Sequence, residues 1–162
     1  DMLGKKDIAE KYTKKAKEMA AEWVKMADDG DHYRLTFDKP GTWSQKYNLV
    51  WDKLLKLQIF PEKVAETEIA YYLTKQNKYG LPLDNRETYT KTDWIMWTAT
   101  MAQDKATFEK FIEPVYLFMD ETTTRVPMSD WVFTDNPIQR GFQARSVVGG
   151  YFIKMLEEKL TK

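Results

Sequence analysis

Three polar segments of the sequence, residues 29–44, 77–91 and 122–143, carry most of the side chains that could do chemistry. Each segment mixes carboxylates with Arg or Lys and with aromatic rings, whereas connections in helical proteins are mostly about two to eight residues long. Carboxylates can act as general acids or bases, Arg and Lys can bind an anionic group, and Trp or Tyr can form the walls of a cleft. We therefore expect these segments to form a polar cleft.

The candidate residues fall into two groups. The carboxylates suited to acid–base catalysis are Asp84, Asp93 and Asp130. The side chains suited to binding a substrate are His32, Arg34, Trp43, Gln45, Lys46, Tyr47, Arg86, Lys91, Trp131, Gln143 and Arg145. Each also has a structural interpretation, in which salt bridges, helix caps and packed rings hold the loops together; Ser44 and Asp93, for example, stand near expected helix starts.

The composition excludes several kinds of site. The 162 residues include one His and no Cys, which rules out disulfides, a thiolate nucleophile, and Cys-bound or multi-His zinc. Lys+Arg and Asp+Glu number 25 each. The chain therefore has no net positive charge with which to bind a nucleic acid or a membrane surface, and we expect neither as a partner. The sequence contains no apolar run long enough to span a membrane and no nucleotide-binding motif. We expect no cofactor and no bound metal.

Apolar residues recur at helical spacing through most of the chain, which predicts helices rather than strands. The predicted helices span residues 5–28, 45–57, 61–76, 92–103, 105–121 and 144–160. We expect Asp104 to cap the fifth helix, Pro114 to kink or split it, and Gly149-Gly150 to mark close backbone packing in the last one. Short strands in the long loops, for example at 32–37, are compatible with the pattern.

The predicted helices alternate between amphipathic ones and apolar ones that must be buried. The order of amphipathic helix, long loop and apolar helix occurs three times, with apolar helices beginning near 45, 92 and 144. This order predicts a single all-α domain over residues 1–162, in which helical hairpins form part of an α/α toroid with the long loops on one face. Because the chain begins at Asp1, without an initiator Met, we expect it to be a piece of a longer protein.

Six stretches of the sequence resemble the glutaminase A family of fungi and bacteria. They are DGDHYRL at 29–35, PGTWSQKYNLVWD at 40–52, YGLPLDNR at 79–86, TKTDW at 90–94, RVPMSDW at 125–131 and GFQARSVVGG at 141–150. The resemblance runs through essentially the whole chain, in order, and several of the stretches are long. It implies the C-terminal part of a six-helical-hairpin domain of the kind that follows β-rich domains in longer proteins.

The resemblance also implies an activity and a location. Family members are secreted or periplasmic enzymes that hydrolyse L-glutamine to L-glutamate and ammonia, so the expected partners are a small-molecule substrate and the remaining domains of a larger protein. Amide hydrolysis needs an activated water or nucleophile, a proton donor for the departing ammonia and stabilisation of an oxyanion. Under this hypothesis Asp84, Asp93 or Asp130 is the base or acid, while the cations Arg86, Lys91 and Arg145 bind the substrate carboxylate or stabilise the oxyanion.

Two other functions remain open at this stage. Helical toroids whose faces carry Trp and acidic residues also suit carbohydrate binding, or carbohydrate hydrolysis by paired carboxylates. Alternatively, the chain is a non-catalytic scaffold part of a larger enzyme. Binding of sugars distinguishes the first alternative, and activity that survives substitutions on the loop face distinguishes the second.

Overall fold

Helices form most of the fold, together with one small sheet. The structure, a computed structural model, describes residues 3–160. The elements are α1 (Lys6–Ala27), the 3₁₀-helix η1 (Tyr47–Leu49), α2 (Val50–Leu54), α3 (Glu62–Leu73), β1 (Tyr89–Lys91), α4 (Thr92–Thr100), α5 (Lys105–Glu121), β2 (Trp131–Phe133), β3 (Gln139–Gly141), the 3₁₀-helix η2 (Ser146–Phe152) and α6 (Ile153–Leu160). Among the described helices, none is both long and apolar enough to cross a lipid bilayer.

The predictions for α1, α3, α4 and α5 are confirmed to within a few residues. The side chain of Asp104 caps α5 by accepting a hydrogen bond from the Thr107 N–H, as predicted. Pro114 lies inside α5 without splitting it. A proline deprives the carbonyl four residues earlier of its helical donor, and here the side-chain amide of Gln76 donates to that carbonyl, on Lys110, at 2.9 Å. An outside donor therefore helps α5 to continue past the proline.

The helix predicted over 45–57 is wrong at both ends, because only η1 and α2 form. Residues before η1 are extended: Ser44 pairs with Asp84 in an isolated bridge, and the Gln45 N–H donates to the Leu83 carbonyl. Ser44 is therefore not a helix cap. The helix α2 ends at Leu54, three residues before the predicted end. The Asp52 carboxylate then accepts hydrogen bonds from the backbone N–H groups of Ile59 and Phe60.

The helix predicted over 144–160 starts instead as the 3₁₀-helix η2, and the α-helical part is α6. Close backbone packing is confirmed at one of the two glycines. A Cβ atom on Gly150 would stand 2.9 Å from Cβ of Asp93 and 3.0 Å from Nε1 of Trp97, whereas one on Gly149 would meet nothing within 4 Å. Only glycine at position 150 lets η2 lie this close to α4.

A small antiparallel sheet in the order β1-β2-β3 joins two of the long loops in a fold that is otherwise helical, as predicted. Lys91 pairs with Trp131 in β2, and Trp131 pairs in turn with Gly141 in β3. Each strand has three residues, too few to produce a readable alternation of apolar and polar residues. The segment 32–37 forms no strand; its one bridge joins Tyr33 to Asp28. The sheet joins the second polar segment to the third.

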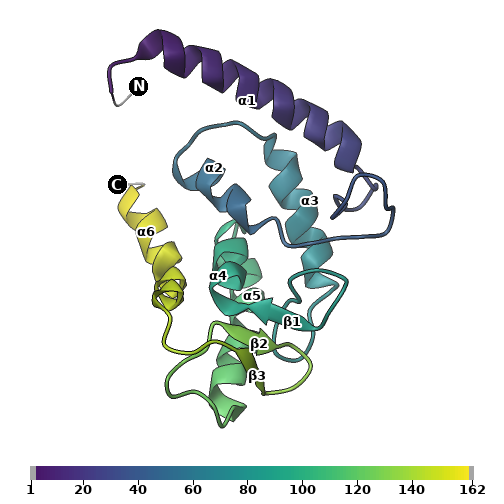
Figure 1. The fold of residues 1–162 in the computed structure, drawn as a ribbon, viewed down its shortest axis with the longest axis vertical. Coiled ribbons are helices and arrows are strands. Elements are labelled where there is room, and N and C mark those ends of the chain that lie inside the picture. The colour runs from purple at the N-terminus through teal and green to yellow at the C-terminus, as the bar shows by residue number, and fades with distance from the viewer. Residues whose placement is uncertain (1–2, 161–162) are drawn as a thin grey trace.

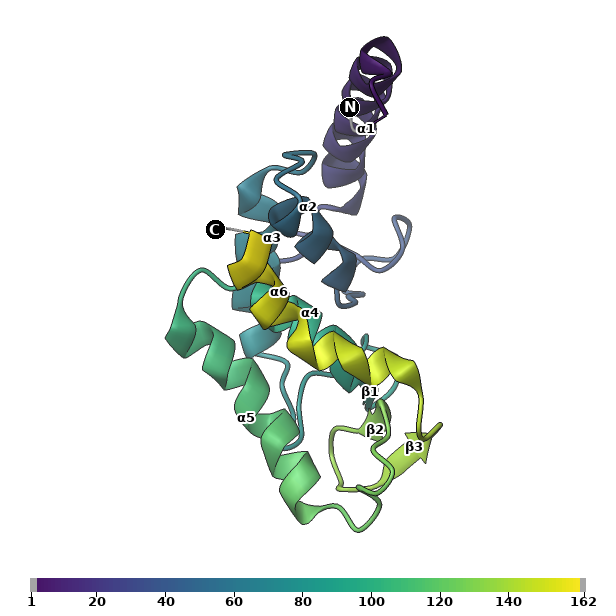
Figure 2. The ribbon, with the colours of Figure 1, turned by 90° about the vertical axis from the view of Figure 1, so that its left-hand side faces the viewer.

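The main core surrounds α4, whose residues Ile95 and Ala99 are completely buried. α5, η2 and α6 pack against α4 (Figure 1). α1 extends away from this body (Figure 2), and only its last turns, at Trp23, Val24 and Ala27, join a small cluster with Tyr33 and Val64. The loops thus lie on a packed base formed by α4 and its neighbours.

The Gln45 side chain ties the first polar segment to this base. Its amide nitrogen donates to the Leu81 and Pro82 carbonyls at 3.1 and 3.0 Å and to the Thr90 hydroxyl at 3.2 Å, and its oxygen accepts from the Thr98 hydroxyl at 3.1 Å. Gln45 is buried, so a substitution that removes the amide leaves these groups without partners or water.

We predict that Gln45→Met lowers the free energy of unfolding by about 2–4 kcal/mol, because at least two buried polar groups lose their partner. Gln103→Met is the matched control: Gln103 is exposed and its one hydrogen bond reaches Glu62, so the expected change is within about 0.5 kcal/mol. Urea denaturation of both variants measures the difference. Equal losses would contradict the structural role of the Gln45 amide.

Candidate functional site

A cluster of charged and aromatic side chains lies where the sheet meets α4. Lys91 is the last residue of β1 and the N-cap of α4, and Asp93 stands in the first turn of that helix. Asp130 directly precedes β2, and its carbonyl accepts the Thr92 N–H at 2.9 Å. Because β1 and β2 pair, the side chains of Lys91 and Asp130 meet although they are 39 residues apart.

The Lys91 ammonium is held between a carboxylate and three aromatic rings. It forms an ion pair with Oδ2 of Asp130, and its Nζ lies 5.9, 6.0 and 5.6 Å from the ring centroids of Trp94, Trp131 and Phe142. A cation at such distances is attracted to the ring faces. Burial and the nearby Arg145 guanidinium lower the pKa of Lys91.

Asp130 is completely buried but has an incomplete set of partners. Its Oδ2 contacts both Lys91 and, at 3.4 Å, Nη1 of Arg145. Its Oδ1 is buried and has no hydrogen-bond partner in the described part of the chain. A buried oxygen without a partner costs about 1–3 kcal/mol, so this atom is suited to bind a group from outside the chain, such as a water molecule or a ligand.

Asp93 is the second carboxylate of the cluster, 3% exposed, and its Oδ1 is likewise buried without a hydrogen-bond partner within residues 3–160. Burial raises the pKa of Asp93, against the opposing influence of Lys91, of backbone hydrogen bonds and of Arg145. Burial thus makes the charged form of Asp93 less favourable than in water, while Asp130 is paired with two cations. Two carboxylates in different environments are the arrangement from which separate acid and base roles arise.

The segment that carries Arg145 has an unusual backbone. Phe142 and Ala144 both have positive φ angles, of 51° and 54°, which residues with a Cβ rarely adopt. The Ser129 hydroxyl contacts the carbonyls of Gly141 and Phe142 at 2.7 and 2.6 Å and holds this segment against β2. Strained backbone of this kind gathers at ligand sites, and here it places Phe142 and Arg145 over Lys91 and Asp130.

The 3₁₀-helix η2 closes the far side of the cluster. The Tyr151 hydroxyl donates to the Thr92 hydroxyl at 2.5 Å, and burial raises the pKa of Tyr151 to about 12. Gly150 lies against Asp93. These contacts fix the first turn of α4, which carries Asp93.

Of the residues predicted from sequence, the structure brings together Lys91, Asp93, Asp130, Trp131 and Arg145. Tyr47 adjoins them, because its ring stacks on Trp94 with centroids 4.1 Å apart and planes 9° apart. Tyr47 and Trp94 also line a cavity of about 430 Å³ beside the cluster, together with Gln45 and Lys46. The cluster and this cavity share the Tyr47–Trp94 stack as a wall.

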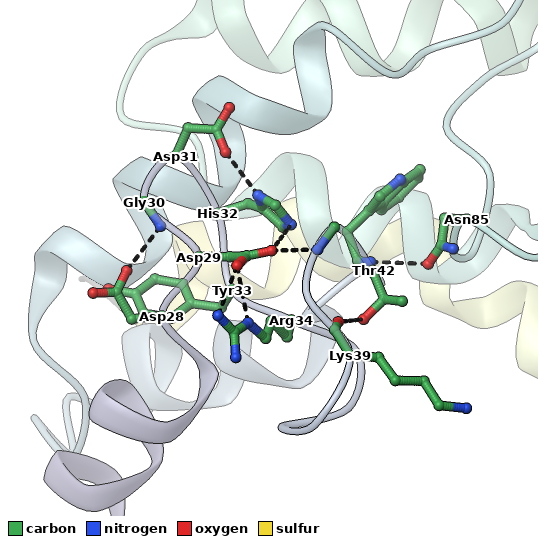
Figure 3. A network of polar contacts seen from close by, with 12 residues as sticks. Asp28, Asp29, Gly30, Asp31, His32, Tyr33, Arg34, Lys39, Thr42 and Asn85 are labelled. Carbon is green, nitrogen blue, oxygen red and sulfur yellow. Dashed lines mark hydrogen bonds and ion pairs between the residues drawn. The ribbon is translucent and has the colours of Figure 1, made fainter.

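Other predicted residues lie in a separate network around Asp29 (Figure 3). The Asp29 carboxylate accepts hydrogen bonds from Nε of Arg34 at 2.9 Å and from the Gly41 N–H at 2.5 Å, and it lies 3.4 Å from Nε2 of His32. The Gly41 hydrogen bond is the largest cause of a lowered pKa of Asp29. His32 also stacks on Tyr71, with centroids 4.2 Å apart. In this structure His32 and Arg34 hold the first polar segment in shape.

The remaining predicted residues also have partners outside the cluster. Burial opposes ionisation of Asp84, but hydrogen bonds from Arg86 lower its pKa. The Asp84 carboxylate accepts these bonds from the backbone and the guanidinium of Arg86 and so stabilises one turn. The Trp43 ring is packed in the core. Gln143 donates to the Pro127 carbonyl. Within residues 3–160, none of the five residues Asp84, Arg86, Trp43, Gln143 and Gln45 forms a hydrogen bond or ion pair with Lys91 or Asp130.

Sequence reasoning missed Trp94, Phe142, Gly150 and Tyr151 as parts of this cluster. Trp94 directly follows Asp93 in the sequence, whereas Phe142 and Tyr151 reach the cluster only through the long-range fold. Within residues 3–160, no group of three or more His, Cys, Asp or Glu side chains is placed to hold a metal ion.

Comparisons with known proteins give a consistent result. Residues 1–155 match the glutaminase A six helical-hairpin domain. Glutaminase A of Aspergillus oryzae (strain ATCC 42149 / RIB 40) is 32% identical over 160 residues, covering 94% of this chain and 23% of that protein. A protein named "Probable glutaminase" of Arthroderma benhamiae (strain ATCC MYA-4681 / CBS 112371) is 29% identical over 161 residues, covering 81% of this chain and 19% of that protein. No solved structure matches the chain.

The raised pKa of Asp93 and the lowered pKa of Asp84 predict opposite effects of pH on two Asp→Asn variants. Since folded Asp93 binds its proton more tightly than unfolded Asp93, ionisation costs stability as pH rises through the folded pKa. Asp93→Asn removes this cost, so the stability of the variant relative to the natural protein should increase as pH rises from acid toward neutral.

Asp84 provides the control with the opposite sign. Its ionised form is favoured by folding, and that stability is lost as pH falls through the lowered folded pKa. Asp84→Asn should therefore destabilise the protein at pH 7, and by less at acid pH. Urea titrations at several pH values measure both differences. A parallel pH dependence of the two variants would contradict the assignment of Asp93 as a carboxyl whose charge is disfavoured.

Proposed function

Because the chain belongs to the glutaminase A six helical-hairpin domain family, we propose that it is part of an amidohydrolase that converts L-glutamine to L-glutamate and ammonia. Two relatives whose names include glutaminase support this proposal. The chain spans 23% and 19% of the length of these relatives, so the activity is proposed for the whole protein to which such a chain would belong. An α/α toroid, completed by further hairpins, and a secreted or periplasmic location are parts of the same proposal.

One observation carries the proposed chemistry: two buried carboxylates, each with an oxygen that has no partner within residues 3–160, stand beside two cations. The proposed base is Asp130, whose Oδ1 would take a proton from a water molecule as the water oxygen attacks the amide carbon. The proposed acid is Asp93, which would give its proton to the nitrogen as the carbon–nitrogen bond breaks and ammonia leaves. Solvent would then return a proton from Asp130 to Asp93.

The two cations have distinct proposed roles. The Lys91 ammonium, fixed between Asp130 and the aromatic rings, would stabilise the negative charge that develops on the amide oxygen. Arg145 is 40% exposed at its side chain and contacts Asp130 only at 3.4 Å. A guanidinium binds a carboxylate with two parallel hydrogen bonds, so Arg145 would turn toward the α-carboxylate of glutamine and uncover Asp130.

Substitution of Arg145 tests this assignment. Arg145→Gln should weaken binding of L-glutamate and L-glutamine about 10- to 100-fold, because a charge-assisted hydrogen bond is lost. The matched control is Arg140→Gln: this guanidinium lies 4.9 Å from the Trp131 centroid, and its loss should change binding about twofold or less. Calorimetric titration of the chain and thermal shifts measure the affinities. A ligand at 100 times its dissociation constant raises the free energy of unfolding by about 2.7 kcal/mol.

The same titrations distinguish the alternatives. A thermal shift with sugars alone would favour the carbohydrate function, for which the Trp and Tyr faces of the cluster are suited. No shift with any ligand, together with ammonia release by a longer protein that survives Asp93→Asn and Arg145→Gln, would favour a scaffold role for this part of the enzyme.

A further inference from the structure

The cavity beside the Lys91–Asp130 cluster has mostly apolar walls, although residues of the polar segments contribute to its lining. It lies between η1, the end of α1 and the first turn of α4, with a volume of about 430 Å³, within the range of about 300–1,000 Å³ that is typical of ligand pockets. Half-buried side chains form its walls: Trp23, Leu35, Leu49, Phe60, Leu83 and Trp94. Apolar groups that stay partly open to solvent at a cavity favour an apolar occupant.

Two of the polar side chains at this cavity, those of Lys46 and Gln45, are already engaged in hydrogen bonds. Lys46 is the one charged residue in the lining, and its ammonium donates to the Tyr33 carbonyl, the Ser44 carbonyl and the Ser44 hydroxyl at 3.0, 3.0 and 3.2 Å. The Gln45 amide is fully used in the contacts that hold its own segment. The cavity therefore offers little to a charged ligand.

A second hollow shows the contrast. It has a similar volume, about 420 Å³, and lies between α2 and α3, where its lining includes Asp52, Lys53, Lys56 and Glu62. Neither Lys91 nor Asp130 lines this hollow. Of the six apolar side chains named above, only Leu49 and Phe60 also line it. It provides a matched control for the apolar cavity.

The apolar cavity borders the Lys91–Asp130 cluster through one shared side chain, Trp94. Trp94 lies 5.9 Å from Lys91 Nζ at its ring centroid and also lines the cavity, with Tyr47 stacked on it at 4.1 Å. In glutamine the amide carbon and the α-nitrogen are four bonds apart, at most about 5 Å. A glutamine whose amide lies at the cluster can therefore direct its α-nitrogen past the Tyr47–Trp94 stack toward the cavity.

We propose that this cavity binds the apolar residue that precedes a C-terminal glutamine, so that short peptides ending in glutamine are a preferred substrate class of the site. The inference rests on the proposed function, because it places the glutamine amide at Asp93 and Asp130. Free glutamine is polar around its α-carbon and leaves the apolar walls empty. A peptide such as Phe-Gln keeps the free α-carboxylate for Arg145 and fills the walls with an apolar ring.

Calorimetric titrations of the chain with L-glutamine, Gly-Gln, Phe-Gln and Phe-Ala test the inference. Phe-Gln should bind about tenfold more tightly than Gly-Gln, because burial of most of an apolar side chain corresponds to at least that factor. Asn48 is exposed on the rim of the cavity, and Asn48→Trp fills its mouth. In this variant the ratio of the two affinities should fall to about one.

The matched control is Gln103→Trp, which fills the charged hollow instead and should keep the tenfold ratio. Equal binding of Gly-Gln and Phe-Gln by the natural chain would overturn the inference and leave the proposed function intact. Phe-Ala binding as tightly as Phe-Gln would also overturn it, since the cavity would then act independently of the amide site. No binding of any glutamine compound would instead contradict the proposed function in this chain.

Discussion

The buried ion pair between Lys91 and Asp130 is the contact on which the arrangement of the polar segments depends. It joins the end of β1 to the start of β2, and the Thr92 N–H and hydroxyl reinforce it through the Asp130 carbonyl. Removing one partner of a buried pair leaves an uncompensated charge, at a cost of about 3–5 kcal/mol. The ion pair therefore joins the sheet to the first turn of α4, and the Ser129 and Tyr151 hydroxyls hold the segment leading to η2 and η2 itself against them.

This arrangement is not optimised for stability. Asp93 and Asp130 each bury an oxygen without a partner among the described residues, and Phe142 and Ala144 keep a strained backbone. Such features persist only where the surrounding structure offsets them. The apolar helix α4, with its contacts to α5, η2 and α6, supplies that support. The trade of stability for chemically available groups is typical of binding and catalytic sites.

The sequence predicts the long helices well because their apolar periodicity extends over many residues, as in α1 and α5. It fails where backbone partners come from distant segments. The Gln45 N–H bonds to Leu83 and not to a helical carbonyl, so the expected helix starts late. Within the candidate site, Lys91 and Asp93 are neighbours in sequence and could be grouped in advance. Asp130 and Arg145 join them only through strand pairing and two positive φ angles, and neither has a local signature.

Only the last turns of α1 pack against other parts of the described chain, and this determines how the helix behaves in solution. Most of the stability of a protein helix comes from tertiary packing, and local opening free energies follow the density of buried contacts. Amide protons near Trp23 and Ala27 should therefore exchange with solvent slowly, while those in the first turns exchange orders of magnitude faster. Local stability thus rises along α1 from its first turn to its last, and the stable end is the one nearest the apolar cavity.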